Sequence, residues 1–179
     1  MEGNVKEQET AKDKLSDALI CIMKEKPFEE ISVTDISERA KVSRMAFYRN
    51  AQSKEDLLRY RIEKLSQRFI MQNGSLIFCS LPQYYENLFS FFLEKKEFFA
   101  LLERAGFLYM VKDIIDRYYF EQARSVEEKK DIREYESYYF SGALYNVFLL
   151  WERKGMQESP KEMAHLYCRI SQSGWDKKQ

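Results

Sequence analysis

The residues of this chain best suited to binding a polyanion are Ser43–Asn50. Their order, Ser-Arg-Met-Ala-Phe-Tyr-Arg-Asn, predicts a helix of about two turns with the serine as its N-cap. Phe47 can point inward, whereas Arg44, Tyr48 and Arg49 occupy the remaining surface. Arginine, tyrosine and asparagine side chains on a short, rigid helix suit contacts with phosphates and with base edges in a groove.

A second short helix is predicted directly upstream, over residues 32–40. Ser32 and Asp35 have the spacing of a capping box, with Asp in place of the usual Glu. Two residues, Lys41 and Val42, separate this helix from the N-cap of the next one. Two short helices joined by so tight a turn form a helix-turn-helix.

The helices that must position this pair are predicted on either side of it. A first helix, from about Thr10 to Glu25, carries an apolar stripe at helical spacing: Leu15, Ala18, Leu19, Ile22 and Met23. Packed on the two short helices, this stripe makes a three-helix unit that is too small to be very stable alone. A further helix, N-capped by Ser53 and running to about Met71, is expected to support the unit and to connect it with the rest of the chain.

Helix is predicted for the remainder as well, so the expected fold class is all-α, with about nine helices. The 179 residues include 6 Gly and 3 Pro, which favours long helices with short connections. No sustained alternation of apolar and polar residues indicates a sheet. Aromatic and aliphatic residues at helical spacing mark further helices near residues 84–93, 98–102, 108–119, 132–153 and 160–171.

Charge is distributed unevenly along the chain. Residues 39–68 contain nine Lys or Arg and three acidic residues, a net charge of +6 in a chain whose net charge is zero. A basic end on an otherwise acidic body favours binding to a polyanion. An ordinary solvated helix surface can show the same excess, and the adjacent helix-turn-helix pattern is what favours the first interpretation.

Several classes of function lack the residues they need. A single histidine, His165, leaves little material for metal sites or for Ser-His and Cys-His catalysis, and the cysteines at positions 21, 79 and 168 have no metal or disulfide spacing. We expect reduced thiols, with redox sensing as the alternative. The first 14 residues lack the apolar segment of a signal peptide, and the longest apolar run, Val147–Trp151, cannot span a bilayer. We therefore expect no catalytic residue, metal, cofactor or membrane partner, and a cytoplasmic location.

The N-terminal landmarks together resemble those of TetR/AcrR-type transcriptional regulators. The match covers roughly residues 12–64 and rests on Pro27, Phe28, Ile31–Ile36, Ala40, Val42, Ser43, Phe47, Tyr48 and Ser53–Leu58. The rest of the chain is similar to that family's C-terminal domain in length and helical layout. The resemblance implies a three-helix DNA-binding domain over residues 1–55, with the start of a connecting helix at 54–71, and a regulatory and dimerisation domain over residues 56–179.

The resemblance implies a transcriptional regulator, with repression the expected sign, that binds a palindromic operator in double-stranded DNA as a homodimer. Tyr48 and Lys54 match family positions that touch the DNA backbone. The complete set of residues expected to contact DNA is Thr34, Ser43, Arg44, Met45, Ala46, Tyr48, Arg49, Asn50 and Lys54.

By the same resemblance, the C-terminal domain would bind a small effector that changes the spacing of the two reading helices. Its aromatic content fits an apolar or aromatic ligand. The expected lining is Phe69, Phe92, Phe99, Phe107, Met110, Ile114, Tyr118 and Tyr139. A plain hydrophobic core would show the same aromatic stripes, so both interpretations stay open.

The helix predicted over residues 132–153 is apolar on most sides, so it must be buried on most sides. Its own bundle can cover one face and a second subunit the other, and Ser141–Ala143 would allow close helix contact. With the helix at 160–171, it should form a four-helix dimer interface. The expected interface residues are Gly142, Tyr145, Phe148, Leu149, Trp151, Met163, Leu166, Tyr167 and Ile170.

Three residues depart from the family pattern. Lys41 stands where the family usually has a turn glycine, Ala46 where it often has threonine, and Ala51 where it often has an aromatic residue. A lysine with positive φ costs about 1 kcal/mol, Ala46 lacks a hydroxyl for DNA, and Ala51 thins the packing behind the reading helix. These departures keep an alternative open, that of a TetR-like coactivator that binds a protein partner and not an operator.

Overall fold

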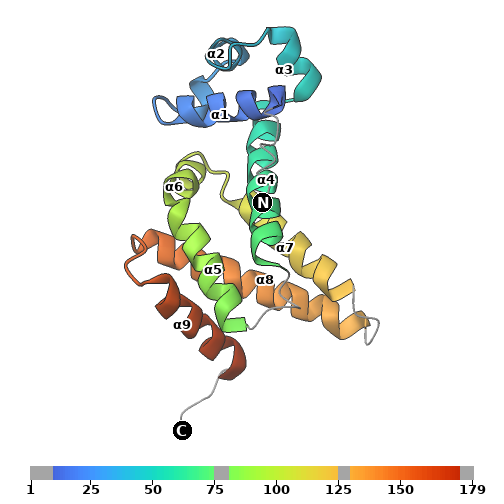
Figure 1. The fold of residues 1–179 in the computed structure, drawn as a ribbon, viewed down its shortest axis with the longest axis vertical. Coiled ribbons are helices and arrows are strands. Elements are labelled where there is room, and N and C mark those ends of the chain that lie inside the picture. Colours follow the sequence, from blue (N-terminus) through green and yellow to red (C-terminus); the bar gives the residue numbers. More distant parts are fainter. Residues whose placement is uncertain (1–9, 75–80, 125–129, 174–179) are drawn as a thin grey trace, which may run out of the picture. The chain divides into compact units, whose positions relative to one another are not determined.

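Every regular element that the computed structural model describes is helical, which confirms the predicted fold class. The described residues are 10–74, 81–124 and 130–173, so Cys79 lies outside them. Within these ranges the helices are α1 (Ala11–Met23), η1 (a 3₁₀ turn, Phe28–Glu30), α2 (Val33–Arg39), α3 (Arg44–Asn50), α4 (Lys54–Asn73), α5 (Leu81–Glu94), α6 (Lys96–Arg104), α7 (Tyr109–Arg124), α8 (Lys130–Arg153) and α9 (Pro160–Ser173) (Figure 1). None of the helices in these ranges has the length and apolar character needed to cross a membrane.

The chain divides into two compact units, Met1–Lys64 and Leu65–Gln179, which we describe separately as unit 1 and unit 2. The division falls inside α4, so that helix contributes its first half to unit 1 and its second half to unit 2. The sequence placed the end of the DNA-binding domain at residue 55, and that functional boundary stays a prediction.

Unit 1 has the core that the sequence predicted. The apolar stripe of α1 is buried, and α1, α2 and α3 pack on one another in pairs. The largest side chains of this core with almost no exposed surface are Leu15, Leu19, Met23, Ile36, Phe47, Leu57 and Leu58.

Polar contacts also join α1 to the first half of α4. The Asp13 carboxylate, which is 4% exposed, accepts hydrogen bonds from Lys64 Nζ at 2.6 Å and from the Tyr60 hydroxyl at 2.9 Å. Nearby, Arg61 pairs with the more exposed Asp17 at 2.7 Å. Burial by itself raises the pKa of Asp13, but the hydrogen bonds to its carboxylate, led by that from Lys64, outweigh burial and hold the pKa well below its usual range.

Replacing Asp13 by asparagine is therefore expected to destabilise unit 1 by about 2 kcal/mol, because a buried charge-assisted hydrogen bond is removed. The folded-state pKa is depressed, so the stabilisation is present above the unfolded-state pKa of about 4 and is lost at lower pH. The difference in unfolding free energy between the parent and Asp13→Asn, measured by urea unfolding, should be constant between pH 6 and 8. The matched control, Asp17→Asn, breaks an exposed pair and should cost about 0–1 kcal/mol. Equal losses of stability in the two variants would contradict the role of Asp13.

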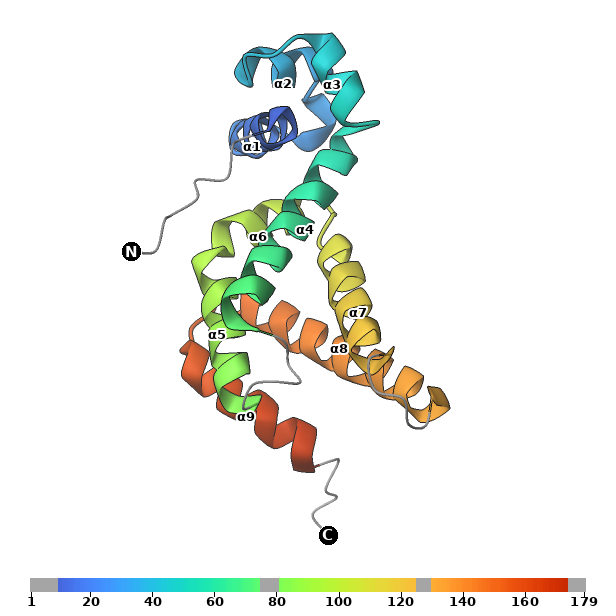
Figure 2. The same ribbon diagram turned by 45° about the vertical axis from the view of Figure 1, so that its right-hand side comes forward.

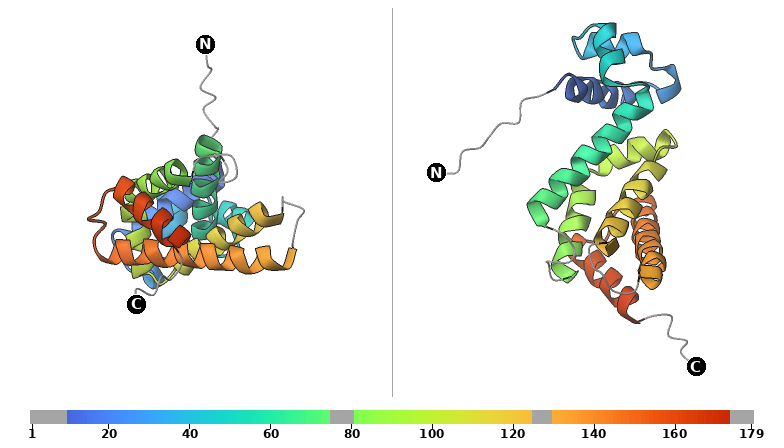
Figure 3. Two further views of the ribbon diagram at one scale, coloured as in Figure 1. Left: turned by 90° about the horizontal axis from the view of Figure 1, so that it is seen from below. Right: turned by 90° about the vertical axis from the view of Figure 1, so that its right-hand side faces the viewer.

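Unit 2 is built on two helix pairs. The helix α5 lies against α9, and α7 lies against α8 (Figures 1 and 2). Figure 3 shows the same pairing from two further directions. The second half of α4 joins this unit through Phe69, whose ring lies 5.7 Å from that of Tyr84 and 5.3 Å from that of Phe91.

The aromatic half of α8 is buried inside unit 2. The Phe148 ring lies 4.4 Å from the Phe92 ring and 5.2 Å from the Phe99 ring, and Trp151 packs edge-on against Phe89 at 5.5 Å. Phe148 is 0% exposed and Trp151 is 2% exposed. The expectation that these two side chains lie on an exposed face is therefore wrong, because rings from α5 and α6 cover them within one protomer.

Two carboxyl groups, Glu103 on α6 and Glu152 on α8, interact directly beside Arg153. Burial, followed by the hydrogen bond and repulsion from Glu103, raises the pKa of Glu152 to about 7. The same hydrogen bond, together with Arg153 Nε at 3.1 Å, lowers the pKa of Glu103. The shared proton therefore belongs on Glu152, which donates to the Glu103 carboxylate. The Tyr145 side chain lies near enough to Glu103 and Arg153 for both charges to influence its pKa.

Glu152→Gln is expected to stabilise unit 2 at high pH, because glutamine keeps an N–H donor to Glu103 at every pH. In the parent, the raised pKa makes this contribution complete below the unfolded-state pKa, and it is lost as pH rises through about 7. The variant's melting temperature should exceed the parent's by about 2–4 °C at pH 8, and the gap should shrink towards pH 5. The control is Glu121→Gln on the exposed surface of α7. A gap that is independent of pH would rule out the shared proton.

Candidate nucleic-acid interface

The turn between α2 and α3 has the geometry that the helix-turn-helix pattern predicted. Lys41 has φ = +55°, which confirms that this position needs the left-handed conformation. Its N–H bonds the Glu38 carbonyl at 3.1 Å, and the Val42 N–H bonds the Ser37 carbonyl at 3.0 Å. These two bonds close the C-terminus of α2, so the turn is held even without glycine.

The reading helix α3 is fixed at its start, on its inner side and near its end. The Ser43 side chain accepts from the Ala46 N–H at 3.1 Å, and Phe47 is completely buried. Ala51, which follows the helix, is buried as well. Asn50 donates its side-chain amide back to the Ala46 carbonyl at 2.7 Å. One of its two amide N–H groups is therefore occupied within α3.

Four side chains remain on the outer side of α3. We call them the reading face: Arg44, Met45, Tyr48 and Arg49, all of them exposed. Met45 is 67% exposed and Tyr48 is 56% exposed, so two large side chains with apolar surface lie among these cations. Thr34, near the start of α2, is also exposed, whereas Ala46 is half-buried.

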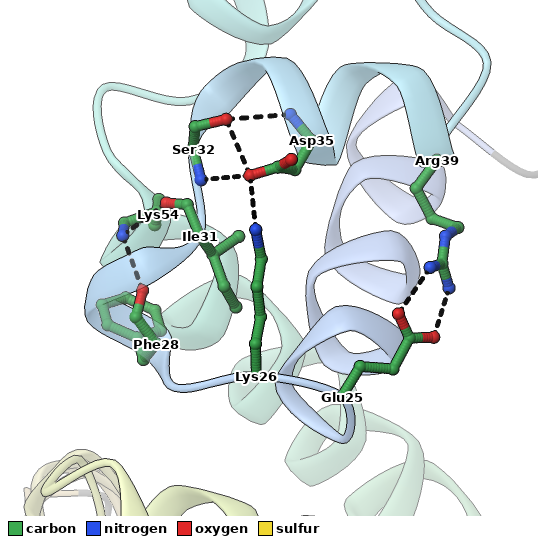
Figure 4. A network of polar contacts seen from close by, with 8 residues as sticks. All are labelled: Glu25, Lys26, Phe28, Ile31, Ser32, Asp35, Arg39 and Lys54. Carbon is green, nitrogen blue, oxygen red and sulfur yellow. Dashed lines mark hydrogen bonds and ion pairs between the residues drawn. The ribbon is translucent and has the colours of Figure 1, made fainter.

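Two cations of unit 1, Lys26 and Arg39, are neutralised by carboxylates (Figure 4). Arg39 on α2 makes two hydrogen bonds to Glu25, at 2.9 and 2.7 Å. Lys26 pairs with Asp35 at 2.9 Å, and Asp35 also caps α2. Hydrogen bonds from these cations are the first cause of the lowered pKa of both Glu25 and Asp35. The sequence counted Arg39 in the basic patch, but its charge is matched in place.

Lys54, the first residue of α4, holds the turn that precedes α2. Its ammonium donates to the Phe28 carbonyl at 2.8 Å and to the Ile31 carbonyl at 2.7 Å, and lies 4.4 Å from the centre of the Phe28 ring (Figure 4). An ammonium has three N–H donors, so one remains for a phosphate. The sequence analysis missed this structural role, since the two carbonyl groups lie 26 and 23 residues upstream and leave no local signal.

The unmatched positive charge of the helix-turn-helix lies on the turn and on α3. Within the part of the chain that the structure describes, Lys41, Arg44 and Arg49 make no ion pair, and all three are exposed. Three exposed cations beside two exposed side chains with apolar surface can bind phosphates and base edges together.

Comparisons with known families agree with this geometry. The family model for bacterial regulatory proteins of the tetR family matches residues 16–60, and the model for the transcriptional regulator C-terminal region, of tetR type, matches residues 80–173. The chain belongs to the TetR family. It is therefore a DNA-binding transcription regulator and not an enzyme.

Solved structures share the TetR-family fold. A TetR transcriptional regulator from Streptococcus agalactiae 2603V has a TM-score of 0.61 at 17% identity, with 89% of this chain and 92% of that chain covered. The dihydroxyacetone kinase operon activator DhaS has a TM-score of 0.57 at 18% identity, covering 89% and 93%. The fatty acid degradation regulator FadR from Bacillus halodurans has a TM-score of 0.58 at 15% identity, covering 96% and 99%. No curated protein sequence gives a significant match.

The residues predicted to line an effector pocket of this TetR-family protein fall into three groups. Phe69, Phe92, Phe99, Met110 and Ile114 are buried in unit 2, Phe107 and Tyr118 are half-buried, and Tyr139 is 60% exposed. Sequence reasoning missed a polar pair in the same core, where the Tyr85 and Tyr119 hydroxyls are 3.0 Å apart. The i, i+3 and i+4 apolar pattern gives no sign of which tyrosine hydroxyls will meet.

The residues predicted for the dimer interface are also divided. Phe148, Trp151, Met163 and Tyr167 are buried within one protomer, and Gly142, Tyr145 and Leu149 are half-buried. Leu166 and Ile170 on α9 are 39% and 48% exposed, and they are joined on α8 by Leu150 at 56%. Leu166 and Ile170 lie one turn apart, so they form a small exposed apolar surface on α9.

Proposed function

We propose that this TetR-family regulator binds a palindromic DNA operator as a homodimer and represses transcription there. The observation that carries the proposal is the reading face, with Arg44 and Arg49 exposed beside Met45 and Tyr48 and with Lys41 next to them. Sequence-specific DNA binding uses this combination of exposed cations and side chains that can reach base edges. A protein that acts on an operator works in the cytoplasm, which is the location we propose.

The homodimer is supported by two considerations. One short helix buries too little surface for specific binding, so a regulator of this kind needs two copies of α3 at a fixed spacing. The exposed apolar side chains Leu166 and Ile170 on α9, and Leu150 on α8, are available for contact between the two copies.

A small apolar or aromatic effector is the proposed signal that releases the operator. Its support is the aromatic interior of unit 2, in which Tyr85 and Tyr119 provide buried hydroxyl groups among apolar rings. Binding sites for small ligands have this composition, with few polar groups in apolar surroundings. Titration of the operator complex with indole and with benzoate, followed by fluorescence anisotropy, tests whether such a ligand releases DNA.

A coactivator that binds a protein partner is the second candidate function. It is favoured by the absence of a side-chain hydroxyl at Ala46 and by the structural similarity to an operon activator, DhaS. In that case the exposed Met45 and Tyr48 would fit an apolar pocket on the partner.

Electrophoretic mobility shift with DNA flanking the protein's own gene separates the two functions. We expect a discrete complex whose affinity falls steeply with salt. Three cations on each of two subunits predict a slope of log K against log salt of about −5. If the mobility of the DNA is unchanged even at low salt, and the protein instead binds a second protein, the coactivator function is favoured.

A further inference from the structure

We propose that Met45 recognises the 5-methyl group of one thymine in each operator half-site. This inference rests on the proposed operator binding and adds the base that the centre of the reading face selects. It makes Met45 a specificity-determining residue whose role differs from that of the arginines beside it.

The position of Met45 on α3 follows from its distance to the buried anchor. Phe47, two residues later, is 0% exposed and points into the core, so Met45 points about 160° away from it. Arg49, four residues after Met45, lies on one side of it, and Tyr48, three residues after it, lies on the other side. Met45 is therefore at the centre of the face that would enter a groove.

Few polar groups compete with Met45 at the centre of α3. Asn50 donates one of its two amide N–H groups to the Ala46 carbonyl at 2.7 Å, which holds this half-buried side chain against the backbone of α3. Ala46 has a methyl group and no hydroxyl. The outward centre of this helix is therefore apolar, with cations at its edges.

Base edges in the major groove carry one large apolar group, the thymine methyl. A methionine side chain has no hydrogen-bond donor and a weak sulfur acceptor, so it cannot distinguish the polar edges of the other bases. It is long and flexible enough to fit around a methyl group, and burying that group stabilises the complex. Contact with thymine is therefore the pairing that the chemistry of Met45 favours.

The test begins with selection of the operator from random double-stranded DNA by the full-length protein. Each thymine of the two half-sites is then replaced symmetrically by deoxyuridine, which removes the methyl group and nothing else. At one position per half-site we expect an affinity loss of about fourfold per methyl group, or about 15-fold for the symmetric pair.

The variant Met45→Ala must lose this sensitivity to deoxyuridine at that position and keep it at any other sensitive thymine. Met71→Ala is the matched control, because Met71 on α4 is 85% exposed and lies outside the helix-turn-helix. Equal melting curves for Met45→Ala and the parent exclude an effect on folding.

Two outcomes overturn the inference in different ways. If the parent binds a defined operator but Met45→Ala responds to every deoxyuridine as the parent does, Met45 does not read a thymine although the proposed function holds. If selection enriches no sequence, the proposed function itself fails, and an apolar pocket on a protein partner becomes the explanation for the exposed Met45.

Discussion

Replacing both Leu166 and Ile170 by glutamate is expected to give a folded monomer whose affinity for operator DNA is lower by about 100-fold or more. The two side chains are 39% and 48% exposed in one protomer, and they lie one turn apart on α9. In a monomer the new carboxylates stay in water. In the proposed dimer they would be buried without partners, so assembly is strongly disfavoured. DNA binding falls with it, because the second reading helix is no longer tethered to the first.

Light scattering measures the mass directly, with the parent expected at twice 21.5 kDa and the double variant at 21.5 kDa. Tyr109→Glu is the matched control, since Tyr109 on α7 is 50% exposed and belongs to a different surface. Phe148→Glu serves as a comparison for unfolding, because that side chain is fully buried and its replacement should lower the melting temperature. A parent protein that scatters as a monomer at micromolar concentration would refute the dimer.

The contrast between Phe148 and Leu166 shows what the sequence could not predict in unit 2. Local periodicity identified α8 as apolar on most sides, and that was sufficient to predict a buried helix. Which side faces its own bundle depends on Phe89, Phe92 and Phe99, which lie about 50 to 60 residues away in the chain. No local pattern encodes such packing, so the core and the exposed surface of α8 could not be separated in advance.

Unit 1 was more predictable, because short-range signals determine most of it. The capping box of Ser32 and Asp35, the N-cap at Ser43 and the positive φ of Lys41 are all present in the structure. The capping box at Thr10 and Asp13 also follows a local pattern, yet it was overlooked. A local pattern could not predict that the same Asp13 would bind Tyr60 and Lys64.

The positive charge available to DNA in residues 39–68 was overestimated for a related reason. Counting charges along the chain treats every lysine and arginine as available to DNA. In the structure Arg39 is matched by Glu25, and Lys54 is bonded to two backbone carbonyls. The charge that remains for DNA is therefore smaller than the count and is concentrated on Lys41 and α3.

Variants of the exposed arginines and of the bonded Lys54 should therefore differ in whether they lose DNA binding or stability. Arg44→Ala and Arg49→Ala should melt like the parent, because both side chains are exposed and have no partner among the residues that the structure describes. Whichever arginine reaches a guanine should lose about 1–3 kcal/mol of binding free energy per half-site and relax specificity at that position. Replacing an arginine that binds a phosphate should instead reduce the salt slope by about 1 for each phosphate that is no longer neutralised.

Lys54→Ala, by contrast, should mainly lower the stability of unit 1. The substitution leaves the Phe28 and Ile31 carbonyls without their donor, at a cost of about 1–3 kcal/mol in the unfolding free energy of unit 1. Thermal melts and anisotropy titrations over a range of salt concentrations separate the two effects for all three variants. If Lys54→Ala melts like the parent and its salt slope falls as for an arginine that binds phosphate, the ammonium must exchange its carbonyl partners for phosphate when DNA binds. The ion pairs of Lys26 and Arg39 would then be sufficient to hold α2 in place. Contact with DNA, as expected from the sequence, would be the main role of Lys54.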